Sequence, residues 1–149
     1  MDIRNTKERP TLVIRTSTPV EKLPEVMGSS FGEIMQVMGS AGTQPAGPPF
    51  AMYHNMDMSN LDVEMGFPVA RKTEGRGRVK AGTLPGGKAA AILHMGPYDR
   101  IGEAYEQLTA FVKEKGLEPQ SICYEFYLND PAETAPEELQ TEIYFPLKG

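Results

Sequence analysis

The feature that most constrains the fold of this chain is an internal repeat, because residues of the first half recur in the second at a nearly constant distance. Residues 18–20 align with residues 96–98 at a shift of 78 (97 minus 19 for the shared proline). The next stretch aligns at a shift of 74 (105 minus 31), and the shift returns to 78 (142 minus 64) near the end. The aligned pairs keep like residues together: Phe31 with Tyr105, Ile34 with Leu108, Val37 with Phe111, Met38 with Val112, Gly42 with Gly116, Pro45 with Pro119, Tyr53 with Tyr127, Asn55 with Asn129, Glu64 with Glu142, Phe67 with Phe145 and Pro68 with Pro146. Such self-similarity indicates one supersecondary unit used twice.

Each copy of the repeat is predicted to contain a strand, a helix and two further strands. In the first copy, residues 10–70, the expected strands are 11–17, 50–55 and 61–70, and the best part of the expected helix is 30–38. In the second copy, residues 88–149, the expected strands are 88–95, 121–128 and 141–147, with a helix at 98–115 and a short helical turn at 136–139. At the join, residues 85–87 have a turn sequence, Pro-Gly-Gly, that predicts an antiparallel hairpin of 78–84 with 88–95.

A duplicated β-α-β-β unit predicts an α+β fold. Units of this kind form an antiparallel sheet with two main helices on one side. Two such units leave a cleft where they meet, and clefts at such junctions are favoured sites for ligands. We therefore expect residues 1–149 to form one domain with a central ligand groove.

The strand predicted within residues 121–130, SICYEFYLND, contains one residue that needs an explanation, Glu125. Side chains alternate between the two faces of a strand, so Tyr124 and Phe126 share one face, while Cys123, Glu125 and Tyr127 share the other. The first face is interpreted as core. The second face either looks at solvent or lines a ligand groove, and the strand alone leaves both interpretations open.

A comparison of the two copies extends the second face to other strands. In the last strand, Ile143, Phe145 and Leu147 are interpreted as core, which leaves Glu142 and Tyr144 on the opposite face. The same alternation in both copies gives the full set of candidate groove residues: Glu125, Tyr127, Glu142 and Tyr144 in the second copy, and Ala51, Tyr53, Glu64 and Gly66 in the first. On this interpretation, one half supplies carboxylates and the other supplies room for a ligand.

Charge and composition argue against several functional classes. The net charge is −5, and basic residues cluster only in the short segment 71–80, which argues against nucleic-acid binding. The first ten residues are charged and no apolar run reaches membrane-spanning length, so we expect a cytoplasmic protein with no membrane partner. The lone Cys123 is interpreted as a packed hydrophobe, and His54 and His94 lack metal-ligand spacing, so we expect no metal and no cofactor.

Three motifs, at these distances from one another, resemble the GyrI-like small-molecule-binding family. They are HMGPY at 94–98, YEFYLNDP at 124–131 and PEELQTEIYFPL at 136–147. The family includes the effector-binding domains of AraC-type and MerR-type multidrug regulators. The resemblance covers nearly the whole chain and implies two tandem SHS2 modules with a central groove for bulky, aromatic, often cationic compounds. Because the repeat uses every segment, we expect a standalone form that does not bind nucleic acid directly.

The resemblance also implies roles for individual residues. Glu125 matches the family's buried groove carboxylate, while Glu142 and Tyr144 match its supporting acid and aromatic wall. Tyr53 and Tyr127 match further wall positions. Binding is the favoured function, because a flat lipophilic cation gains from apolar burial, from stacking on tyrosine rings and from a buried counter-charge.

Two other classes of function stay open at this point. Some proteins that resemble this family hydrolyse cyclopropane-bearing toxins, which implies Glu125 as general base and Tyr127 or Tyr144 as hydrogen-bond donor. The family's gyrase-inhibitor members imply a third class, in which the chain acts on a protein partner.

Overall fold

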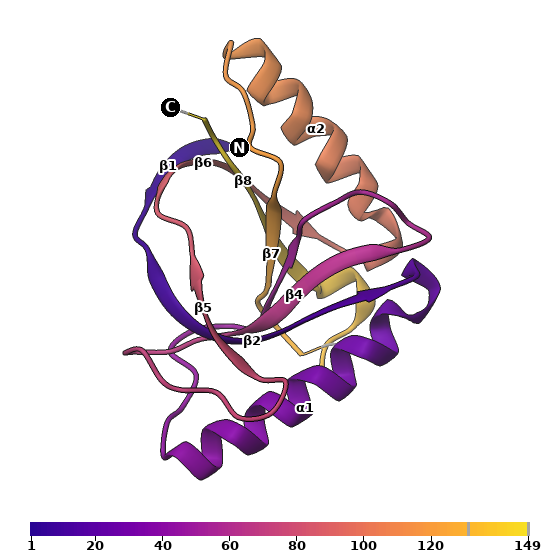
Figure 1. The fold of residues 1–149 in the computed structure, drawn as a ribbon. Helices are drawn as coiled ribbons and strands as arrows, with labels where there is room; N and C mark the ends of the chain where they lie inside the picture. Colours follow the sequence, from indigo (N-terminus) through magenta and orange to yellow (C-terminus); the bar gives the residue numbers. More distant parts are fainter. Residues whose placement is uncertain (131, 149) are drawn as a thin grey trace.

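The computed structural model describes residues 1–130 and 132–148, which form one curled antiparallel sheet and two main helices. The strands are β1 (Asp2–Thr6), β2 (Arg9–Thr18), β3 (Phe50–Tyr53), β4 (Leu61–Pro68), β5 (Lys80–Leu84), β6 (Gly87–Met95), β7 (Cys123–Tyr127) and β8 (Gln140–Pro146). The helices are α1 (Leu23–Ala41) and α2 (Ile101–Glu114), with short 3-10 turns η1 (Val20–Lys22), η2 (Tyr98–Arg100) and η3 (Pro136–Glu138). The sheet curls into a half-barrel, and both helices lie outside it (Figure 1). The predicted α+β class is confirmed.

The pairing of the strands is the same in the two halves of the sheet. The strand order is β1-β6-β8-β7-β3-β4-β2-β5. The halves meet where β3 pairs with β7, and from this junction the order runs through β4 and β2 on one side and through β8 and β6 on the other. Isolated bridges of Pro45 with Val69 and of Pro119 with Leu147 occupy matching places in the two halves. The junction of β3 with β7 is therefore the middle of the sheet.

The helices close over one face of the sheet through residues spaced four apart. The buried positions are Ser30, Ile34 and Met38 in α1, and Ala104, Leu108 and Val112 in α2. Each helix is followed by a glycine with positive φ, Gly42 after α1 and Gly116 two residues after α2. No helix within the described residues is long and apolar enough to cross a membrane.

The hairpin expected around residues 85–87 is wrong. β5 pairs with β2 at one end of the sheet, whereas β6 pairs with β1 and β8 near the other end. The glycine at position 86 allows two chain segments to approach closely, because a Cβ atom there would lie 2.7 Å from the backbone nitrogen of Glu8. The strand β1 was not predicted, because the start of the chain is charged. It pairs with β6 on the side where the hairpin prediction placed β5.

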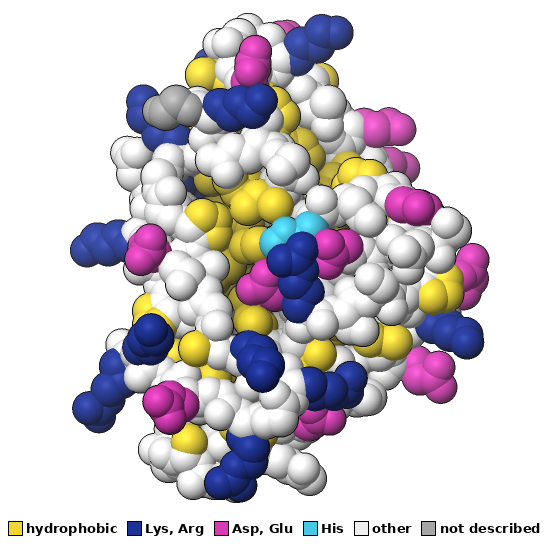
Figure 2. Space-filling view, in the orientation of Figure 1, with side chains coloured by type: hydrophobic (Ala, Val, Ile, Leu, Met, Phe, Trp, Pro, Cys, Tyr) yellow, Lys and Arg dark blue, Asp and Glu magenta, His cyan; other side chains and the backbone are white. Residues whose placement is uncertain are grey.

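Both faces of the curled sheet are buried. The helix-bearing face packs against α1 and α2, and the opposite face forms its own core inside the half-barrel, built from Val13, Phe50, Met52, Leu84, Ala89, Ala91, Tyr124, Phe126 and Tyr144. Figure 2 shows hydrophobic side chains within a hollow near the middle of the view, with charged side chains around it. Because side chains are buried on both faces, two predicted site residues can meet only when they lie on the same face of the sheet.

Candidate functional site

A groove of about 1520 Å³ lies on the helix-bearing face, with walls from both helices and a floor from β3 and β7. Its lining is mainly apolar and aromatic and includes Val20, Leu23, Met27, Phe31, Tyr53, Met56, Met58, Tyr98, Ile101, Tyr105, Cys123, Glu125 and Tyr127. Its volume exceeds the several hundred cubic ångströms of a typical ligand pocket. The groove can therefore hold a bulky molecule.

Glu125 lies on the floor of this groove and is only 6% exposed. The phenol groups of Tyr105 and Tyr127 each donate a hydrogen bond to one of its carboxylate oxygens, at 2.8 Å for Tyr127. No lysine or arginine of the described residues forms an ion pair with Glu125. Burial raises the pKa of Glu125, although the two phenols and the nearby His94 oppose the rise. Glu125 therefore has no ion-pair partner among the described residues.

Four tyrosines surround the carboxylate. Tyr53 and Tyr127 come from the floor of the groove, and Tyr98 and Tyr105 come from η2 and α2. The rings of Tyr98 and Tyr127 meet edge to face, with centroids 5.9 Å apart. Burial, and after it the negative charge of Glu125, raises the pKa of all four phenols. These hydroxyl groups therefore stay neutral near pH 7 and act as hydrogen-bond donors.

Cys123 borders the groove beneath α2. Its side chain is a free thiol, 8% exposed. Burial raises the pKa of Cys123 to about 11, so the thiol stays protonated near neutral pH. The interpretation of Cys123 as a packed hydrophobe is confirmed.

The expectation that Glu142 and Tyr144 share a face with Glu125 is wrong. β7 and β8 pair Glu125 with Ile143, and Tyr124 with Tyr144. Directly opposed residues of paired strands point to the same face, so Glu142 and Tyr144 lie on the face opposite the groove. The sequence pattern failed because β8 has buried apolar residues on both faces, and the alternation then does not tell which face carries the helices.

Glu142 and Tyr144 instead belong to a polar network on the opposite face. The Arg4 guanidinium donates to Glu142 at 2.9 Å and to the Tyr144 hydroxyl at 2.8 Å, and this hydroxyl donates to Glu142 at 2.8 Å. The Tyr144 ring stacks on Tyr124, with centroids 5.0 Å apart and an interplanar angle of 9°. The network fastens β1 to β8.

Two predicted site residues of the first copy, Glu64 and Ala51, also lie on opposite faces of the sheet. Glu64 pairs with Met52 on the face opposite the groove, and its carboxylate oxygen lies 2.9 Å from His54 Nε2. Ala51 lies on the helix-bearing face, but it is fully buried beneath the groove lining. Gly66 pairs with Phe50 on the face opposite the groove. Of the eight candidate groove residues, the structure therefore brings Tyr53, Glu125 and Tyr127 together in the groove.

The sequence interpretation missed Tyr105 as a site residue. The repeat aligns Tyr105 with the apolar residue Phe31, and this alignment indicates a packing role for Tyr105 in the helix expected at 98–115. A buried phenol needs a hydrogen-bond partner, however, and the only acidic side chain of the strand at 121–128 is Glu125. That requirement was the available signal for pairing the two residues.

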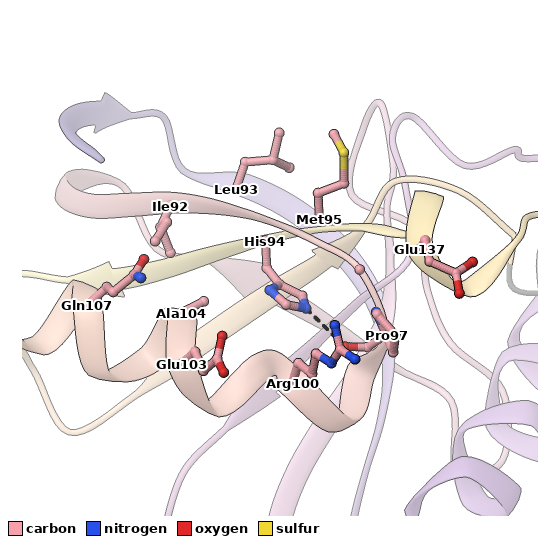
Figure 3. Close-up of a pocket in the computed structure, with 11 residues that line it drawn as sticks. Ile92, Leu93, His94, Met95, Pro97, Arg100, Glu103, Ala104, Gln107 and Glu137 are labelled. Atoms are coloured by element: carbon pink, nitrogen blue, oxygen red, sulfur yellow. Dashed lines mark hydrogen bonds between the residues drawn. The ribbon is translucent and has the colours of Figure 1, made fainter.

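A smaller pocket of about 270 Å³ lies between the end of β6 and the start of α2 (Figure 3). Arg100, Glu103 and Glu137 line it, and His94 Nε2 lies 3.0 Å from the carbonyl oxygen of Pro97. Among the residues that the structure describes, no group of three or more histidine, cysteine, aspartate or glutamate side chains could hold a metal ion.

Solved structures share this fold over almost the whole chain. The crystal structure of the EcmrR C-terminal domain aligns with a TM-score of 0.88 at 23% identity, covering 99% of this chain and 96% of that one. In a cryo-EM structure of an EcmrR–DNA complex, the TM-score is 0.87 at 23% identity, and the alignment covers 99% of this chain but only 56% of the EcmrR chain.

Two further solved structures with this fold are more distant in sequence. A hydrolase from Listeria innocua, encoded by lin2189, aligns with a TM-score of 0.72 at 16% identity, covering 99% of this chain and 91% of that one. SAV2435, solved with bound tetraphenylphosphonium, aligns with a TM-score of 0.67 at 12% identity, covering 99% and 93%. At these identities the likeness establishes the fold.

The match to a family model agrees with the resemblance that the three motifs carry. No curated protein matches the chain. The sequence model of the GyrI-like small-molecule-binding domain matches residues 1–148. The chain therefore belongs to the GyrI-like small-molecule-binding domain family.

Proposed function

We propose that this chain binds bulky, lipophilic, aromatic cations in the groove between α1 and α2. The observation that carries the proposal is Glu125, a buried carboxylate that two phenols hold in place and that has no ion-pair partner among the described residues. A buried, unpaired charge is costly, and a cation in the groove offsets this cost.

The rest of the groove fits the apolar part of such a ligand. Burial of apolar surface contributes about 25 cal/mol per Å². A cation near the faces of Tyr53, Tyr98 or Tyr127 gains roughly 0.5–2 kcal/mol for each ring contact. Thioether side chains such as those of Met27, Met56 and Met58 adapt to different shapes. These contacts make few geometric demands, so we propose that the groove accepts several different ligands.

A distant relative supports the choice of ligand class. SAV2435 was solved with tetraphenylphosphonium, a lipophilic cation without hydrogen-bond donors. A ligand of that kind suits a carboxylate whose two oxygens already accept hydrogen bonds from Tyr105 and Tyr127. Its charge is satisfied by proximity to Glu125 and by ring faces, without a direct hydrogen bond.

The test is a calorimetric titration with tetraphenylphosphonium and with triphenylphosphine oxide, a neutral molecule that also has an aromatic propeller shape. We expect the cation to bind at least about tenfold more tightly, because only the cation gains from Glu125. Equal affinity for the two molecules would contradict the cationic part of the proposal, and no binding of either molecule would contradict the ligand class.

Hydrolysis is a second candidate, favoured by one specific observation. Burial raises the pKa of Glu125 toward the range of a general base, and two phenols stand beside it as hydrogen-bond donors. Tyr144 lies on the opposite face and cannot assist, so the candidate donors are Tyr105 and Tyr127. Incubation with electrophilic cyclopropane compounds, followed by mass spectrometry, distinguishes the two functions. A binding protein gives no ring opening above the buffer rate, and Glu125-dependent ring opening would establish the enzyme.

A further inference from the structure

We propose that Met56 and Met58, at the mouth of the groove, are oxidation sites that control ligand binding. A hydroperoxide converts their thioethers to sulfoxides, and the groove then binds its ligand more weakly. The inference rests on the proposed function, since it concerns the same groove, but it adds a chemical modification that regulates the groove.

Met56 and Met58 differ from the other methionines of the chain because they are exposed and also line the groove. The chain has nine methionines. Met56 and Met58 are 62% and 50% exposed, and both line the groove. Three others are exposed but lie outside the groove lining, namely Met1, Met35 and Met95, and three are buried, namely Met38, Met52 and Met65. Met27 lines the groove from α1 and is less exposed than Met56 and Met58. Solvent oxidants therefore reach Met56 and Met58 first among the groove methionines.

The loop that carries Met56 and Met58 is held by hydrogen bonds. The Asp57 carboxylate accepts from the backbone nitrogen of Ser59 at 3.0 Å and from its hydroxyl at 2.7 Å. The carbonyl oxygen of Met58 accepts from the backbone nitrogen of Val20 at 2.9 Å, which fastens the loop to η1 at the edge of the groove. The two apolar side chains are therefore presented at the groove by an ordered turn.

The chemical step needs only the thioether and the peroxide. A sulfur lone pair attacks one peroxide oxygen, the S–O bond forms and the O–O bond breaks. The sulfur loses two electrons, the oxygen transferred to sulfur gives up its proton, and the departing hydroxide or alkoxide takes up one proton, so that the peroxide is reduced to water or, for an organic peroxide, to an alcohol. The product is a polar, chiral sulfoxide in place of a flexible apolar side chain. A sulfoxide in contact with a lipophilic ligand loses its hydration without gaining a hydrogen bond, which weakens binding.

The experiment compares three proteins before and after treatment with hydrogen peroxide: the parent chain, M56L/M58L and the matched control M35L/M95L. Leucine keeps the apolar volume and cannot form a sulfoxide. Peptide mass spectrometry identifies the oxidised methionines, and titration with tetraphenylphosphonium gives the affinity. Thermal unfolding checks that the fold survives the treatment.

We expect oxidation at Met56 and Met58, with an affinity about tenfold weaker in the parent chain and in M35L/M95L. M56L/M58L keeps its affinity after the same treatment, and methionine sulfoxide reductases restore binding in the other two proteins. Unchanged affinity in parent protein that is oxidised at both positions would overturn the inference while leaving the proposed function intact, as would an equal loss in M56L/M58L. No binding by the untreated proteins would overturn both.

Discussion

Ala51 and Glu125 are direct register partners across the strand pair that joins the two halves of the sheet. Both side chains lie on the helix-bearing face, yet one half contributes a methyl group and the other a carboxylate. Ala51 belongs to an apolar cluster against which Leu23, Met27 and Phe31 of α1 pack, whereas Glu125 receives hydrogen bonds from two phenols. The groove is therefore chemically one-sided, although the two halves share their strand order.

This relationship predicts that a carboxylate is tolerated on only one side of the junction. Ala51→Glu places a charge among apolar neighbours with no phenol donor from α1. We expect the free energy of unfolding to fall by about 3 kcal/mol, because the new charge is buried and unpaired. Urea denaturation followed by circular dichroism measures the loss. Ala51→Leu is the control for added volume, and equal losses in the two variants would show that size rather than charge is responsible.

The raised pKa of Glu125 makes stability depend on pH. A carboxyl group whose pKa is higher in the folded than in the unfolded state stabilises the fold when it is protonated, and this contribution is lost as pH rises through the folded-state pKa. We expect Glu125→Gln to melt at a higher temperature than the parent chain at pH 8, with the difference disappearing as pH falls toward 4. A lower melting temperature for the variant at pH 8 would show that ionised Glu125 stabilises the fold.

Ligand binding has the opposite pH dependence. The charged form of Glu125 attracts a cation, so the affinity for tetraphenylphosphonium is expected to rise with pH until Glu125 is fully ionised. The four phenols around it have raised pKa values and stay neutral over this range. Titrations between pH 5 and 8.5 check the trend, with Glu125→Gln as the control. A flat profile in the parent chain would contradict the role of Glu125.

The phenol of Tyr105 stabilises the ionised form of Glu125. Its hydrogen bond lowers the pKa of Glu125 against the larger effect of burial. Tyr105→Phe is therefore expected to move the pH midpoint of cation binding upward and to reduce the free energy of unfolding by about 1 kcal/mol at neutral pH. Tyr124→Phe, on the opposite face, is the matched control and leaves the midpoint unchanged. An unchanged midpoint in Tyr105→Phe would mean that its hydroxyl does not affect the carboxylate.

Much of the fold followed from local patterns, whereas the membership of the site did not. The repeat predicted both helices and the strand that carries Glu125, because periodicity and turn residues are local signals. The face of Glu142 and Tyr144 depends on how β8 pairs with β7, which is set by tertiary contacts. Apolar residues on both faces of the curled sheet removed the contrast that a sequence pattern needs. The need of a buried phenol for an acceptor was the sequence signal for the partnership of Tyr105 with Glu125, and the fold makes that signal specific by bringing α2 beside the groove floor.

The affinity for tetraphenylphosphonium in Glu125→Gln and Glu142→Gln tests the central claim most directly. Both substitutions remove one negative charge from neighbouring strands, but only Glu125 faces the groove. We expect Glu125→Gln to bind at least about tenfold more weakly at pH 8, and Glu142→Gln to bind within about twofold of the parent chain. Equal affinity in the two variants, whether both retained or both lost, would contradict Glu125 as the counter-charge of the groove.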